Sequence, residues 1–311
     1  MKKFIINVLV FFTIVCIIDV GVGVLGNYLL EHAKGGSTKK LNDLVMKDIH
    51  DILIFGSSRA VNHYDAPLLS DSLGLDVYNA GYHGNGIVLA EGLLEMVLNR
   101  YHPKMVLYDV EPSFDIYEYK EDNNNIRYLK YLKPYYNQPG ISNIIKDVST
   151  EEWYKIQSGM IRYNTDIIPR VVDNVINRGT DLKGFIPAKG VMTEEPISVT
   201  KELPKVDSLK LTYLQKMITL CKESDVPIYF ISSPKYGTKD SDILQPAKEI
   251  ARKNHIQYWD YYSDSLFNCH KEWFKEPVHL NEKGAKEYSK LLVQRIAALL
   301  PDTPHTSMLK R

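Results

Sequence analysis

The sequence predicts an α/β fold, a three-layer α/β/α sandwich with a mainly parallel sheet. Short apolar runs alternate along the chain with longer segments that carry apolar residues at helical spacing. Because strands and helices alternate in this way, the connections are expected to be right-handed βαβ units, whose helices cover both faces of a parallel sheet. The length of 311 residues favours one globular core with an insertion or a small annex.

The expected elements fall into two blocks on either side of an irregular region. The first block contains strands at 51–55, in the segment ending at Asn79 and at 104–112, with helices after the first strand and at 87–100. The second block contains a helix at 206–225, a strand at 226–234, a helix at 243–255, a strand at 256–261 and a helix at 282–300. Between about 113 and 205 the alternation stops, and a stretch dense in tyrosine predicts an insertion.

The N-terminus is expected to anchor the chain in a membrane. Lys2 and Lys3 precede an apolar stretch at residues 4–25, interrupted by Asp19, which is long enough to cross a bilayer as a helix. The positive-inside rule keeps both lysines in the cytoplasm and sends the rest outside, into the periplasm in a Gram-negative cell. A cleaved signal peptide is the alternative, but no small-residue cleavage site fits well between Val20 and Gly36.

The expected organisation follows from these segments. It comprises a transmembrane anchor at 1–30, a polar stalk at 31–50, an α/β domain at 51–300 with its insertion at about 113–205, and a polar tail at 301–311.

Composition argues against several classes of function. The 38 Lys and Arg residues balance 38 Asp and Glu residues, so we expect no nucleic-acid partner. The three cysteines, Cys16, Cys221 and Cys269, are too few for a disulfide framework. Without metal-ligand spacing or a nucleotide-binding motif, the sequence predicts neither a metal nor a cofactor. The 21 tyrosines suit sugar-like ligands, although most of them can simply be half-buried strand residues.

The turn after the first strand is the first candidate for chemistry. Gly56 permits a tight bend, and Ser58 can present its hydroxyl where the next helix begins. Ligands of parallel sheets bind at the carboxyl ends of the strands, an edge that also holds the glycine-rich loop at 81–86 and the corner at Glu111. The alternative is that the serines only cap a helix.

A second candidate lies near the C-terminus, where Glu276 precedes His279 by three residues. A carboxylate there can hold the imidazole in the tautomer that accepts a proton from a serine. The alternative is a histidine with ordinary polar contacts at a helix start. His63 is a competing base, and His83 is a candidate for lining the pocket. Arg59 can brace a carboxylate, contact substrate or form an outward salt bridge.

Three ordered motifs resemble the SGNH, or GDSL-type, hydrolase family: "FGSSRA", "NAGYHGNG" and "EPVHLN". The resemblance covers about 51–112 and 206–299, and it implies a flavodoxin-like sandwich. It also implies that Ser58 is the nucleophile, His279 the base with Glu276 in place of the family's aspartate, and Gly84 an oxyanion-hole donor. The third family motif normally supplies an asparagine, where this chain has Glu111, Pro112 and Ser113.

The resemblance implies a serine-dependent ester hydrolase that removes acyl groups, especially acetyl, from a carbohydrate or envelope polysaccharide through an acyl-enzyme on Ser58. One alternative is an O-acyltransferase that modifies a cell-envelope polysaccharide. The G-S-S motif and the N-terminal anchor resemble the extracytoplasmic branch of the family that includes the alginate O-acetyltransferase group. A second is an inactive glycan-binding or assembly protein. The expected partners are an acylated carbohydrate and the membrane; the sequence does not identify a protein partner.

Overall fold

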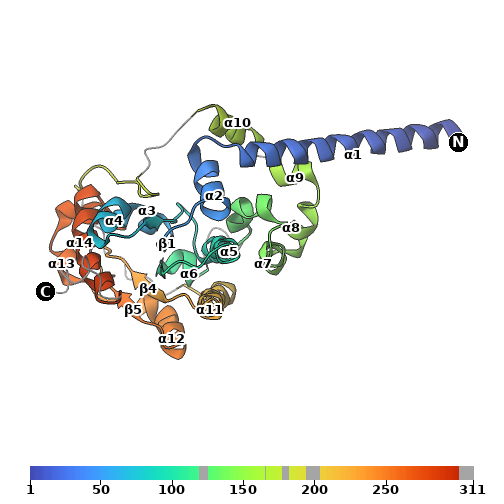
Figure 1. The fold of residues 1–311 in the computed structure, drawn as a ribbon. Helices are drawn as coiled ribbons and strands as arrows, with labels where there is room; N and C mark the ends of the chain where they lie inside the picture. Colours follow the sequence, from blue (N-terminus) through green and yellow to red (C-terminus); the bar gives the residue numbers. More distant parts are fainter. Residues whose placement is uncertain (119–124, 165, 177–181, 194–203, 301–311) are drawn as a thin grey trace. The chain divides into compact units, whose positions relative to one another are not determined.

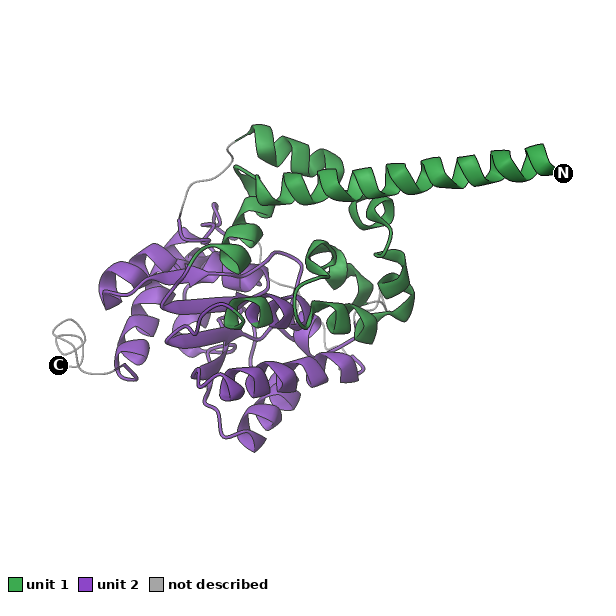
Figure 2. Ribbon diagram, turned by 45° about the vertical axis from the view of Figure 1, so that its right-hand side comes forward, with its two compact units in different colours: residues 1–48, 95–99, 125–180 green, residues 49–94, 100–124, 181–311 purple. Residues whose placement is uncertain are grey.

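The computed structural model describes residues 1–118, 125–164, 166–176, 182–193 and 204–300 (Figure 1). The chain forms two compact units (Figure 2). Unit 1 comprises Met1–Asp48, Glu95–Asn99 and Asn125–Thr180, and unit 2 comprises Ile49–Leu94, Arg100–Asn124 and Asp181–Arg311. The insertion expected at 113–205 is therefore divided between the units, and the expected tail at 301–311 lies outside the described residues.

Unit 2 contains a five-stranded parallel sheet with the strand order β2-β1-β3-β4-β5. Its strands are β1 (Ile52–Gly56), β2 (Val77–Asn79), β3 (Met105–Asp109), β4 (Ile228–Ser232) and β5 (Tyr258–Asp260). This order is that of flavodoxin-like doubly wound sheets, in which ligands bind where the strand order reverses, between β1 and β3 here. The predicted α/β class with a parallel sheet is confirmed.

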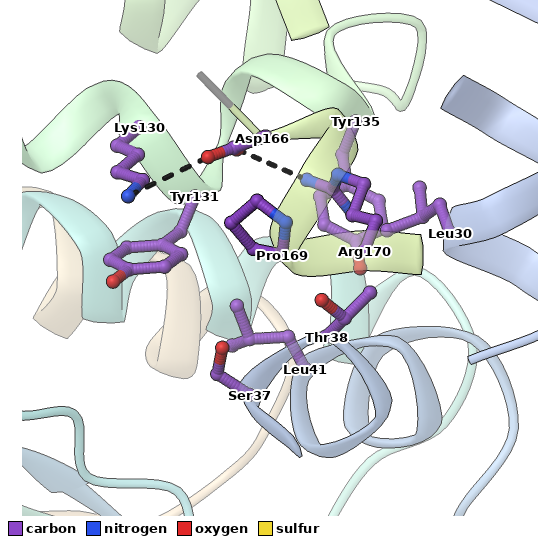
Figure 3. A pocket seen from close by; sticks show the side chains of 10 residues that line it. All are labelled: Leu30, Ser37, Thr38, Leu41, Lys130, Tyr131, Tyr135, Asp166, Pro169 and Arg170. Atoms are coloured by element: carbon purple, nitrogen blue, oxygen red, sulfur yellow. Dashed lines mark hydrogen bonds and ion pairs between the residues drawn. The ribbon is translucent and has the colours of Figure 1, made fainter. Parts of the chain in front are cut away.

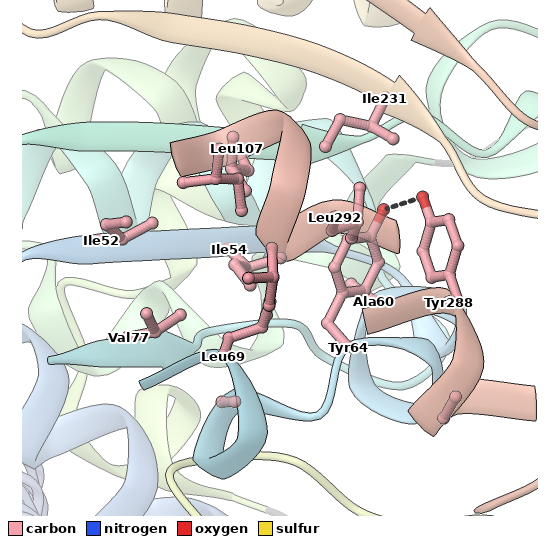
Figure 4. Close-up of a cluster of buried hydrophobic side chains, with 14 of the residues drawn as sticks. Ile52, Ile54, Ala60, Tyr64, Leu69, Val77, Leu107, Ile231, Tyr288 and Leu292 are labelled. Carbon is pink, nitrogen blue, oxygen red and sulfur yellow. Dashed lines mark hydrogen bonds between the residues drawn. The ribbon is translucent and has the colours of Figure 1, made fainter. Parts of the chain in front are cut away.

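Helices cover the sheet of unit 2. They are α3 (Ser58–His63), α4 (Ala66–Leu73), α5 (Ile87–Leu98, whose last turn belongs to unit 1), α6 (Pro112–Asp115), α11 (Ser208–Glu223), α12 (Gln245–Lys253), α13 (Ser265–Asn268) and α14 (Glu282–Ala297), with short 3-10 turns at Asp242–Leu244 and Lys271–Trp273. Alternate strand residues such as Ile52, Ile54 and Leu107 pack against side chains of α3, α4 and α14 (Figure 4). Their neighbours Leu53 and Phe55 are equally buried, which explains why each central strand is a continuous apolar run.

A second, antiparallel sheet pairs β6 (Phe274–Glu276) with β7 (His279–Leu280). The sequence pattern did not predict this hairpin, because strands of three and two residues are too short to show alternation.

Unit 1 consists of helices. They are α1 (Lys2–Glu31), α2 (Gly36–Met46), α7 (Ile141–Val148), α8 (Thr150–Lys155), α9 (Gly159–Tyr163) and α10 (Ile167–Val175), with 3-10 turns at Asn125–Tyr131 and Lys133–Tyr135. Among the described residues, α1 is the one helix long and apolar enough to cross a membrane, a property that signal sequences share. The segment expected as a stalk at 31–50 contains the helix α2.

Candidate active site

Ser58 begins helix α3 at the carboxyl end of β1. The strand ends at Gly56, whose φ of +146° and close approach to Asp109 leave no room for a side chain: an added Cβ would lie 2.8 Å from the Asp109 carbonyl oxygen. Ser57 is fully buried and caps α3, since its Oγ accepts a hydrogen bond from Arg59 N at 3.3 Å. The two serines therefore differ in their environment: Ser57 is buried and caps the helix, whereas Ser58 is partly exposed.

The β6–β7 hairpin places Glu276 opposite His279. The Nδ1 atom of His279 contacts Glu276 Oε1, and its Nε2 atom lies 2.7 Å from Ser58 Oγ. Because the carboxylate occupies the Nδ1 side, Nδ1 carries the proton and Nε2 is free to accept the hydroxyl proton of Ser58. The hydrogen bond from His279 lowers the pKa of Glu276 below its usual range, so Glu276 is charged at neutral pH.

Residues 182–193 form a strap that connects α3 to the hairpin. Ile186 N donates to Val61 O at 3.1 Å, and Asn62 Nδ2 donates to Ile186 O at 2.7 Å. At the other end of the strap, Met192 N donates to Phe274 O at 2.7 Å. The strap therefore joins the helix that carries Ser58 to β6, the strand that ends at Glu276.

A buried chain of hydrogen bonds supports the backbone beside His279. Leu280 N donates to His63 Nε2 at 2.9 Å, so the ring proton of His63 is on Nδ1, which faces Ser233 Oγ at 2.8 Å. Ser233 Oγ in turn donates to Asp109 Oδ2 at 2.9 Å, and Ser233 N donates to Asp109 Oδ1 at 2.8 Å. His63 thus acts on the position of β7, while His279 is the histidine that contacts Ser58.

His63 and Arg59 are both buried in this network. Burial, together with the nearby charges of Arg59 and His279, holds the pKa of His63 well below its usual range, so His63 is neutral. Arg59 is itself only 1% exposed and forms no outward salt bridge with any residue that the structure describes. It donates to the carbonyl oxygens of Ser233 and Pro234, packs over the Tyr262 ring and interacts electrostatically with Asp109.

The glycine-rich loop runs beside α3. Asn79 Nδ2 donates to Ala60 O at 2.7 Å, and Tyr82 N donates to Gly56 O at 2.9 Å, which fixes the start of the loop against the Ser58 turn. Further along, Gly84 has a φ of +66° and open space where a side chain would point, and His83 is exposed. Gly84 therefore lies at the surface, with no other atom within 4 Å of the position of an added Cβ.

Glu111 lies just after the carboxyl end of the neighbouring strand, β3. Its side chain caps α6 by accepting a hydrogen bond from Phe114 N at 3.0 Å.

In the part of the chain that the structure describes, no three His, Cys, Asp or Glu side chains form a group that could hold a metal ion.

The structure thus brings Ser58, His279 and Glu276 into one chain of contacts. Sequence reasoning missed the supporting roles of Asp109 and Ser233. A carboxylate at the end of a central strand was the available signal for Asp109; Ser233 gave no signal in the sequence.

No protein-family model matches this chain, and a comparison with curated proteins finds no match.

Proposed function

We propose that this protein is a serine-dependent ester hydrolase of the SGNH type, with Ser58 as nucleophile, His279 as general base and Glu276 as the residue that orients His279. The observation that carries the proposal is the 2.7 Å separation of His279 Nε2 from Ser58 Oγ, with Glu276 on the other ring nitrogen. Nucleophile, base and orienting carboxylate in this order are the requirements of serine catalysis.

The first half-reaction forms an acyl-enzyme. Ser58 Oγ attacks the ester carbonyl while its proton passes to His279 Nε2, and the charged Glu276 stabilises the imidazolium. His279 then protonates the departing alcohol oxygen as the carbon–oxygen bond of the ester breaks. The negative oxygen of the tetrahedral intermediate would be held by backbone N–H groups at the start of α3 and at Gly84.

In the second half-reaction, His279 removes a proton from water, and the water oxygen attacks the acyl carbon. His279 then returns this proton to Ser58 Oγ as the bond between the acyl carbon and Oγ breaks, which releases a free carboxylic acid. The proposed substrate is an acyl ester, especially an acetyl ester, of a carbohydrate or envelope polysaccharide. The motif resemblance supports this class of substrate. An assay of acetate released from an acetylated glycan tests the proposed esterase activity directly.

Fluorophosphonate labelling of the full chain tests the nucleophile. We expect the unmodified protein to be labelled, Ser58→Ala to lose all labelling, and His279→Ala to be labelled at least about a hundredfold more slowly. Ser57→Ala is the matched control, because the adjacent buried serine only caps α3 and its loss costs about 1 kcal/mol of stability. A labelled Ser58→Ala protein, or an unlabelled but folded parent, would contradict the proposal.

The proposed location is a membrane-anchored domain on the outer side of the cytoplasmic membrane, with Lys2 and Lys3 inside. Contacts of α1 within unit 1 support retention of the helix: Asp19 accepts from Met160 N at 2.9 Å, and Leu29 O accepts from Asn174 Nδ2 at 2.7 Å. We expect the membrane-bound protein to keep residues 1–30, which intact-mass measurement checks. A mature protein that begins after residue 30 would refute the anchor.

A further inference from the structure

Helix α10 has its polar and apolar sides reversed relative to a helix on a water-facing surface. Its charged residues Arg170 and Asp173 are 5% and 8% exposed, whereas Ile168 and Val175 are 77% and 76% exposed. A surface helix of a soluble domain turns its apolar side inward and its charges outward. The exposed side of α10 is therefore suited to an apolar medium.

Contacts inside unit 1 hold α10 in this orientation. The Asp173 carbonyl oxygen accepts from Lys34 N and Gly35 N at 2.9 and 3.0 Å. Arg170 pairs with Asp166 at 3.4 Å, and both side chains line a pocket that also includes Leu30, Thr38 and Tyr135 (Figure 3). The polar side of α10 is thus used within the unit, which leaves the apolar side facing outward.

Helix α9 lies against α1 within the apolar stretch of that helix (Figure 1). The Asp19 carboxylate of α1 accepts from Gly159 N at 3.0 Å and from Met160 N at 2.9 Å, the first two amides of α9. The approach is close, because a Cβ on Gly159 would lie 2.7 Å from Gly23 Cα. Since unpaired amides and charges are both costly in hydrocarbon, this contact makes Asp19 and the start of α9 tolerable there.

Both α9 and α10, which pack against α1, carry exposed apolar side chains, as α1 itself does. Residues 4–18 of α1 are exposed except Val8, which is half-buried. Beside the next turns of α1 lie five exposed apolar side chains, which we call the insertion's apolar face: Met160, Ile161, Ile168, Val171 and Val175.

The length of α1 sets the depth of this face. Residues 4–25 span about 32 Å as a helix, which matches the hydrocarbon thickness of a bilayer. Asp19 lies six residues before the end of that stretch, so the start of α9 is about 9 Å inside the hydrocarbon boundary. Leu29, which Asn174 of α10 contacts, lies about 6 Å beyond the boundary.

We infer that the insertion's apolar face is embedded in the membrane leaflet at the C-terminal end of α1, with lipid acyl chains as its partner. Unit 1 then sits partly within the membrane, α9 deeper than α10. The inference rests on α1 crossing the bilayer and is independent of the proposed ester hydrolysis.

Fluorescence quenching in reconstituted vesicles tests this. In the full chain, Cys16 and Cys269 are replaced by alanine; Cys221 remains, because burial raises its pKa to about 12 and keeps it unreactive. Single cysteines at positions 161 and 168 are labelled with an NBD fluorophore in phosphatidylcholine vesicles that carry doxyl-labelled lipid. Position 10 of α1 is the positive control, and the exposed Lys253 position of α12 is the negative control.

We expect quenching at 161 and 168 to exceed that at 253 at least twofold, with 161 quenched more strongly than 168. Quenching at both positions no greater than at 253 overturns the inference. So does a blue-shifted but unquenched label, which would indicate that a second protein surface covers the face. An unquenched label at position 10 overturns it as well, because α1 would not cross the bilayer. None of these results depends on fluorophosphonate labelling, so the two proposals fail separately.

Discussion

Ser58 Oγ lies 2.7 Å from His279 Nε2, although 221 residues separate the two in sequence. The parallel sheet provides one side of this contact, because β1 delivers Ser58 to its carboxyl edge. The β6–β7 hairpin provides the other side, and the strap at 182–193 joins the two. Substitutions of the residues around this contact are expected to change activity or stability in different ways.

Glu276→Gln should lower kcat by about 100- to 10,000-fold with little change in stability, because a neutral amide no longer stabilises the imidazolium of His279. Glu276→Asp keeps the charge and should lose less activity than Glu276→Gln. Initial-rate measurements on an aryl acetate check both variants. Equal losses would mean that side-chain length, and not charge, is what His279 requires.

Asp109→Ala should cost about 3–5 kcal/mol of unfolding free energy, because Arg59 is left as a buried charge without its neighbouring carboxylate. The double variant Asp109→Ala with Arg59→Met should be more stable than Asp109→Ala alone, since it removes that charge. Urea unfolding measures the difference. If the double variant loses the sum of the two single losses, the charges of Arg59 and Asp109 are not coupled.

His63 should make the protein less stable in acid. Its folded-state pKa lies below the unfolded value of 6.5, so the unfolded chain binds a proton that the folded chain does not. The stabilising contribution is present above pH 6.5 and is lost as the pH falls toward the folded-state pKa, with a slope of up to about 1.4 kcal/mol per pH unit. Urea unfolding between pH 7.5 and 5 should show a shallower decline for His63→Gln.

His102→Gln is the matched control for this pH dependence, since His102 is exposed in the same unit. This variant replaces a surface histidine and leaves the buried contacts of His63 in place. A His63→Gln protein with the parent's pH dependence would contradict this prediction, because it would show that folding leaves the pKa of His63 unchanged.

Gly56→Ala should disrupt the Ser58 turn. The new Cβ would meet the Asp109 carbonyl oxygen at 2.8 Å, and alanine at a φ of +146° adds about 1–3 kcal/mol of backbone strain. Gly84→Ala has no such contact and should lose only about 1–2 kcal/mol from its left-handed backbone. Thermal unfolding compares the stability of the two variants. Equal losses of stability would show that the Asp109 backbone can move away from the new Cβ at position 56.

The order of strands and helices could be predicted because each central strand is a continuous apolar run. Ser58 could be singled out because it follows the end of an apolar strand. Glu276 and His279 could be singled out because they lie three residues apart shortly before a predicted helix. The strap could not be predicted, since its hydrogen bonds use mainly backbone atoms, which leave no pattern in the side chains. The pairing of Ser233 with Asp109 was equally hidden, because two polar residues 124 positions apart carry no mark of contact.

The orientation of α10 shows a different limit. Its sequence has the ordinary amphipathic spacing, so the pattern identifies a helix but not which side faces inward. Only the partners of Arg170 and Asp173 within unit 1 decide that.

The 221 positions between Ser58 and His279 have a consequence for synthesis. A ribosome adds Ser58 to the growing polypeptide long before it adds the β6–β7 hairpin. A nascent chain that stops short of the hairpin therefore carries the hydroxyl without the imidazole that lies against it in the finished fold. Under the proposed mechanism, such a truncated product is inert.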